Sequence, residues 1–170
     1  MATLEEKMEK LTRTELMEHV FNLRVEDIVM YSKILLEQLG KEKAIELVKK
    51  ARWNARYGKG KETAEKLGTP KDVDAYYKAL EEAMAKVPFV PTPSEIVERT
   101  KNRIIFRTTK CFLSDAILAR NLDKDLMDVV REYCNHDEGW AAGFNPEMKF
   151  ERVKFLVDGD DSCQFLCEVK

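Results

Sequence analysis

The chain has 170 residues, of which 44% are hydrophobic and 35% charged, a balance typical of one soluble compact domain with a real core. Acidic and basic residues are interspersed and give a formal net charge of -2, so the sequence offers no basic face for a nucleic-acid backbone. No stretch approaches the roughly 20 apolar residues of a membrane span, and the first ten residues lack the apolar core of a signal peptide. We therefore expect a cytoplasmic protein whose partners include neither nucleic acid nor membrane, with a homo-oligomer left open.

All four cysteines lie in the second half of the chain, at Cys111, Cys134, Cys163 and Cys167. Four cysteines in a chain of this length without a secretion signal favour reduced thiols over a disulfide framework. Cys163 and Cys167 are four positions apart on a predicted strand, so they can share a face without being bonded. The sequence therefore predicts four free thiols.

The first 87 residues have the apolar spacing of amphipathic helices. A first helix is predicted over residues 14–39, with a break near residues 22–25. Gly40 ends it, and a second helix runs from residue 41 to the Gly-Thr-Pro sequence at 68–70. The residues of the first helix predicted to face the core are Leu16, Val20, Leu23, Ile28, Tyr31, Leu35 and Leu39.

A third helix is predicted over residues 71–86, with Thr69 as its candidate N-cap and Pro70 at its first position. Three of the five prolines then fall within residues 87–93, which cannot be helical and mark the main internal boundary. The chain up to this boundary is therefore expected to be entirely helical.

Beyond the boundary, residues 94–109 are rich in Ile, Val, Thr and Phe around a turn candidate at Lys101-Asn102, which predicts a β-hairpin. Helical spacing returns over residues 111–121 and 122–142. Alternating segments at 148–157 and 163–169 flank Asp158-Gly159 and predict a second hairpin.

This order of elements predicts an α+β fold. We expect a single domain over residues 1–170, composed of a helical part at 1–87 and an α+β ligand-binding part at 94–170. The two hairpins most simply join in one antiparallel sheet of about four strands covered by helices.

Cys134, His136 and Asp137 are candidate catalytic residues near the end of a predicted helix. Cys134 and Asp137 are three positions apart and can share a helix face, whereas His136 points elsewhere unless the helix ends there. A carboxylate raises the pKa of a neighbouring thiol, so a catalytic thiolate would need His136 or a cation such as Arg152 close by. The alternative is a buried cysteine, a solvated histidine and a capping aspartate.

Arg152 lies in an alternating strand, and an arginine that points into a cavity can hold a carboxylate through two parallel hydrogen bonds. The alternative is a surface ion pair with Glu151 or Asp161. A zinc site is the less favoured possibility: Cys134, His136, Asp137 and Cys163 could supply four ligands, but no Cys-x-x-Cys spacing is present. We therefore predict no metal and no other cofactor.

Motifs in the last third of the chain resemble the L-2-amino-thiazoline-4-carboxylic acid hydrolase family. They are Tyr133-Cys134, Asp137, Gly143-Phe144-Asn145-Pro146, Phe150-Glu151-Arg152, Gly159-Asp160-Asp161 and Cys163-Gln164-Phe165. The resemblance implies ring-opening hydrolysis of a cyclic amidine-like thiazoline acid to an N-carbamoyl amino acid. Water or the Cys134 thiolate would attack the C=N carbon, and Asp137 or His136 would handle the proton. Asn145, Arg152 and Cys163 are the expected substrate-binding residues, with Arg152 on the carboxylate.

The Gly-Asp-x-x-Cys-x-Phe ending is also similar to small-molecule-binding domains of the four-vinyl-reductase type, some of which hold zinc through cysteines and a glutamate. This sequence has Arg152 where an acidic ligand would be expected. Two hypotheses therefore stand, an enzyme acting on a small-molecule substrate and a non-catalytic small-molecule- or metal-binding module.

Overall fold

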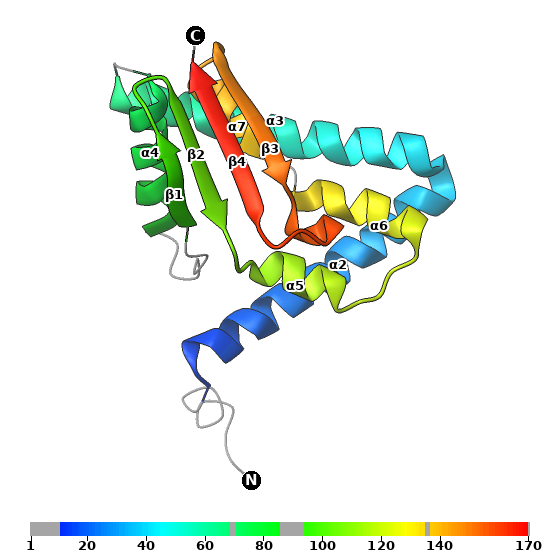
Figure 1. Ribbon diagram of the computed structural model, residues 1–170. Helices are drawn as coiled ribbons and strands as arrows, with labels where there is room; N and C mark the ends of the chain where they lie inside the picture. The colour runs from blue at the N-terminus through cyan, green and yellow to red at the C-terminus, as the bar shows by residue number, and fades with distance from the viewer. Residues whose placement is uncertain (1–10, 69–70, 86–93, 135–136, 170) are drawn as a thin grey trace.

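The computed structural model describes residues 11–68, 71–85, 94–134 and 137–169. Figure 1 shows one antiparallel sheet with α3 and α7 behind it, and with α2 and α5 below its lower end. The helices are α2 (Arg13–Leu39), α3 (Lys41–Leu67), α4 (Val73–Ala85), α5 (Phe112–Leu118), α6 (Lys124–Val130) and α7 (Asp137–Phe144), with short 3-10 turns η1 (Arg131–Cys134) and η2 (Leu156–Asp158). The strands are β1 (Ser94–Arg99), β2 (Arg103–Thr108), β3 (Met148–Lys154) and β4 (Cys163–Val169).

The four strands lie in the order β1-β2-β4-β3, and every neighbouring pair is antiparallel. The predicted α+β class and the union of both hairpins in one sheet are thereby confirmed. The register sets Phe165 of β4 opposite Phe106 on one side and opposite Arg152 on the other. Arg152 therefore shares a row of the sheet with two aromatic residues.

The first two helices are long and continuous. α2 begins with a capping box in which the Thr12 hydroxyl accepts from the Glu15 amide, and Gly40, at φ 75°, separates it from α3. The break predicted near residues 22–25 is wrong, because Val25 is fully buried in an unbroken helix. None of the described helices is both long and apolar enough to cross a membrane.

The predicted inward face of α2 is partly wrong. The fully buried positions include Met17, Val25 and Ser32, whereas Leu23 is 63% exposed and Tyr31 57% exposed. Apolar side chains surround most of this helix, so their spacing alone could not identify the side that packs on the rest of the fold.

The predicted start of the third helix, at Thr69 and Pro70, lies outside the described residues. The Asp72 carboxylate accepts a 2.8 Å hydrogen bond from the Ala75 amide and caps α4. The helix predicted over residues 122–142 is divided, because α6 tightens into η1 at Arg131 and α7 begins at Asp137. Cys134 and Asp137 therefore belong to different elements rather than to one helix face.

α3 and α7 pack so closely that their backbones touch. A Cβ atom on Gly139 would overlap the backbone of Trp53, and one on Gly143 would overlap the carbonyl of Tyr57. The reciprocal glycine on α3, Gly60, lies against the Trp140 carbonyl. Glycine is required at these positions because any side chain would separate the helices. This contact fixes the start of α7, and with it Asp137, against α3.

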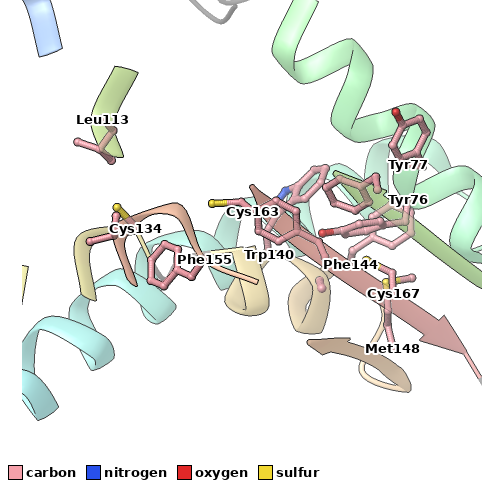
Figure 2. Packing of buried hydrophobic residues seen from close by; sticks show 14 of the residues in the cluster. Tyr76, Tyr77, Leu113, Cys134, Trp140, Phe144, Met148, Phe155, Cys163 and Cys167 are labelled. Atoms are coloured by element: carbon pink, nitrogen blue, oxygen red, sulfur yellow. The ribbon is translucent and has the colours of Figure 1, made fainter. Parts of the chain in front are cut away.

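The core fills the space between the sheet and the helices (Figure 2). Tyr76 of α4 packs against Trp140 and Phe144 of α7, with ring centroids 5.0 Å and 5.6 Å apart. Phe106 and Phe165 stack across β2 and β4 at 5.0 Å. All four cysteines are free thiols, as predicted.

Candidate functional site

Arg152 is the charged residue around which the candidate site is built. Its side chain is only 10% exposed, and its Nη2 atom donates to the Cys134 carbonyl oxygen at 2.8 Å and to Asp137 Oδ2 at 3.4 Å. The guanidinium lies over the ring of Phe155, 4.2 Å from its centroid, and near Phe165 at 5.1 Å. These contacts hold the cation beneath the surface between β3, η1 and the start of α7.

The surface ion pairs considered for Arg152 are not formed. Glu151 pairs with Lys149 at 3.0 Å, and Asp161 pairs with Lys154 at 2.9 Å. Arg152 instead keeps two buried nitrogens, Nε and Nη1, without a partner. A buried donor left unpaired costs about 1 to 3 kcal/mol, so an anion that reached these nitrogens would be bound favourably.

The backbone carbonyl oxygen of Cys134, and not its sulfur, accepts the hydrogen bond from Arg152. The side chain is 7% exposed, and burial raises the pKa of the thiol to about 12, although the nearby Arg152 guanidinium acts in the opposite direction. The thiol is therefore protonated at neutral pH, and a protonated thiol is a poor nucleophile.

Asp137 is the first residue of α7 and carries its carboxylate beside Arg152. The side chain is 31% exposed, so it is reachable by water. Asp137 is also near Arg52 of α3, whose pKa it acts to raise. Asp137 therefore lies between two arginines and is in contact with solvent.

The remaining predicted site residues have different surroundings. Cys163 is 6% exposed, accepts a 3.4 Å hydrogen bond from the Leu156 amide and has a pKa raised by burial. Figure 2 shows it at the same end of β4 as Cys134 and Phe155, whereas Cys167 lies toward Tyr76 and Met148.

Asn145 joins the turn after α7 to the segment before α4. Its Nδ2 atom donates to the Lys71 carbonyl at 2.8 Å, and its Oδ1 atom accepts from the Glu147 amide at 2.9 Å. Both ends of the amide thus have backbone partners, and a substrate contact by Asn145 stays a prediction. His136 lies outside the described residues.

A hollow of about 200 Å³ opens beside Arg152. Charges of both signs surround it, because Arg152 and Lys154 line it together with Glu132 and Asp160. Arg131 and Asp158 also line it and pair with each other at 2.6 Å. The sequence did not predict these two as site residues, since 27 positions separate them and neither belongs to a local motif.

Within the ranges that the structure describes, no three or more His, Cys, Asp or Glu side chains are arranged to hold a metal ion. The cysteines considered as ligands instead pack among apolar side chains: Cys134 and Cys163 both belong to the main hydrophobic cluster.

The model of the L-2-amino-thiazoline-4-carboxylic acid hydrolase family matches residues 6–166, nearly the whole chain. The chain belongs to this family. The match therefore extends the resemblance of the C-terminal motifs to the helical half, and places Arg152, Cys134 and Asp137 within the family's own domain. No curated protein shows a significant sequence match to this family member.

Two solved structures have a similar fold. One is the phenol-responsive sensory domain of the transcription activator PoxR with phenol, with a TM-score of 0.55 and 13% identity over 84% of this chain and 73% of that one. The other is a trafficking protein particle complex subunit 3 from Naegleria fowleri covalently bound to palmitic acid. It has a TM-score of 0.52 and 18% identity, and the match covers 87% of this chain and 96% of that one. At these identities the likeness shows the fold alone.

Proposed function

We propose that the protein is a hydrolase that opens the ring of a thiazoline carboxylic acid, or of a close cyclic amidine acid, to an N-carbamoyl amino acid. The observation that carries this proposal is Arg152, a nearly buried cation with two unpartnered nitrogens beside a small hollow. The family membership supplies the reaction class. Such a substrate is a small zwitterion, and a hollow lined by charges of both signs suits it.

Substrate binding begins at Arg152 in this proposal. The carboxylate of the substrate accepts a hydrogen bond from one of the unpartnered nitrogens, because Nε and Nη1 do not share an edge of the guanidinium. It adds a full negative charge to a guanidinium that otherwise has one carboxylate at 3.4 Å. The protonated amidine end then lies toward the acidic residues Glu132 and Asp160 that line the hollow. The two ends of the substrate are thereby oriented by opposite charges.

Water is the attacking group, since the Cys134 thiol has a pKa of about 12 and stays protonated. Asp137, which contacts Arg152 but does not itself line the hollow, takes a proton from the water as the water oxygen bonds to the C=N carbon. The bond from that carbon to the ring sulfur then breaks, the sulfur takes up a proton, and the carbon becomes the carbonyl of the carbamoyl group. One water is consumed, and no oxidant or reductant is needed.

The test is to incubate the protein with the thiazoline acid and to follow the carbamoyl product. Replacing Arg152 with Ala is expected to raise KM on the order of tenfold to a hundredfold, because a charge-assisted contact to the substrate is lost. Replacing Asp137 with Asn is expected to lower kcat by a factor on the order of 10² to 10⁴, the contribution of a general base.

The matched control is Arg107→Ala, which removes an arginine that pairs with Glu95 on the sheet. It should leave both kinetic constants unchanged. Full activity of the Asp137→Asn variant would remove that residue from the mechanism, and an unchanged KM for Arg152→Ala would remove the carboxylate anchor.

A second candidate is a non-catalytic small-molecule-binding module. It is favoured by the two similar structures, which are a phenol-responsive sensory domain and a protein carrying palmitic acid. Saturable binding of the thiazoline acid without turnover, under reducing conditions and with or without added divalent metal, would decide for this module and against the hydrolase.

A further inference from the structure

Three arginines stand apart from the other arginines of the described chain. Arg99, Arg103, Arg107, Arg120, Arg131 and Arg152 each pair with a carboxylate. Among the described residues, Arg24, Arg52 and Arg56 make no ion pair and no hydrogen bond through their side chains. Arg24 is exposed, so its guanidinium can bond to water, whereas Arg52 is partly buried and has two buried nitrogens without a partner.

The three arginines also lie together. Arg52 and Arg56 are one turn apart on α3 and therefore share a face of that helix. Arg24 lies on α2, which precedes α3 directly. Burial lowers the pKa of Arg52, and the charges of Arg24 and Arg56 lower it further. The protein therefore holds like charges near one another, and the nearby Asp137 carboxylate offsets this repulsion only in part.

The donors of Arg52 have the geometry of an anion site. Its Nε and Nη2 atoms carry the two parallel N–H groups on one edge of the guanidinium, and both are buried without a partner. This edge is the fork with which arginine binds a phosphate or carboxylate through two hydrogen bonds at once. One oxyanion would satisfy both donors and neutralise the repulsion among the three cations.

We propose that Arg24, Arg52 and Arg56 form a binding site for a phosphate group. A phosphate carries up to two negative charges and so neutralises more of the charge of three cations than a carboxylate does. It also has enough oxygens to accept hydrogen bonds from more than one guanidinium. The site borders Asp137, whose charge acts on Arg52, and it is distinct from the Arg152 hollow because Arg52 does not line that hollow. It does not depend on the hydrolase reaction.

Calorimetric titration of the full chain with inorganic phosphate at low ionic strength tests the site directly. Wild-type protein should bind phosphate saturably, with one site per chain. The variant Arg52→Lys keeps the charge and loses the fork, so its affinity should fall at least tenfold. The matched control Arg107→Lys, at an arginine already paired with Glu95, should bind as wild type.

Thermal unfolding separates a ligand-binding role from a structural one. In phosphate-free buffer, Arg52→Gln should raise Tm, because it removes an unpaired buried cation from beside Arg24 and Arg56. Phosphate should raise the Tm of wild type but not of this variant. An arginine with a purely structural role would instead give a lower Tm on substitution.

Four results would overturn the proposal. They are no saturable phosphate binding by wild type, equal affinity in Arg52→Lys, a lower Tm for Arg52→Gln in phosphate-free buffer, and binding to vesicles of phosphatidylcholine and phosphatidic acid without affinity for inorganic phosphate. The last result would assign the arginines to a membrane surface rather than to a soluble phosphate.

Discussion

At the scale of single residues, Cys134 shows how burial determines chemistry. The thiol belongs to the hydrophobic cluster and has a pKa of about 12, while only its carbonyl oxygen meets Arg152. We predict that Cys134→Ser keeps kcat within a fewfold of wild type, because a residue that does not attack the substrate tolerates a hydroxyl in its place. The measurement is steady-state hydrolysis of the thiazoline acid.

Alkylation of the native protein provides an independent readout for Cys134. Its thiol should react with iodoacetamide far more slowly than that of Cys111, which is partly exposed. A fall in kcat of more than about a hundredfold in a folded Cys134→Ser variant would instead identify the sulfur as the nucleophile.

At the scale of elements, the contact between α3 and α7 depends on glycines. A Cβ atom on Gly143 would overlap the Tyr57 carbonyl, so Gly143→Ala should lower the free energy of unfolding by about 1 to 3 kcal/mol, the range for overpacking. Gly58, also on α3, has no atom near its Cβ position. Gly58→Ala should therefore raise the free energy of unfolding by about 0.5 to 1 kcal/mol through helix propensity alone.

Urea unfolding of both glycine variants measures the two effects against wild type. Activity should fall with Gly143→Ala if the position of Asp137 at the start of α7 matters, and it should be unchanged in Gly58→Ala. A higher free energy of unfolding in both variants would mean that the helices separate at little cost, and the close contact would then have no role in fixing the site.

Local sequence patterns encode the strands of this fold better than the packing of its helices. Alternation and turn residues identified both hairpins, because strand periodicity is a local signal. The inward face of α2 could not be predicted, since Leu23 and Tyr31 continue the apolar spacing on its exposed side. The division between α6 and α7 carries no glycine or proline signal, and it depends on how residues 131–134 pack against α3 and α6.

The contacts of the site residues also depend on three-dimensional packing rather than on local sequence patterns. Asp137 and Arg152 pair at 3.4 Å although all of α7 and the turn after it lie between them in the chain. The role of Arg52 could not be predicted, because an arginine on an amphipathic helix looks solvated until the three-dimensional structure shows its buried, unpartnered fork.

At the scale of the whole molecule, buried thiols should limit stability at high pH. Burial raises the pKa of both Cys134 and Cys167 to about 12, from the ordinary thiol value of 9.0. Between these values the folded protein keeps two protons that the unfolded chain loses. The unfolded chain then binds fewer protons than the folded one, so the free energy of unfolding must fall as pH rises.

We therefore predict a stability that is fully present below about pH 9 and then declines by up to about 1.4 kcal/mol per pH unit for each thiol. Urea unfolding at pH 7.5, 9.5 and 10.5 measures the decline. The double variant Cys134→Ser, Cys167→Ser is the control: serine does not titrate in this range, so its curve should start lower and fall less steeply than that of wild type. Parallel curves for the two proteins would show that neither thiol loses its proton on unfolding, and that the alkaline loss of stability arises elsewhere in the chain.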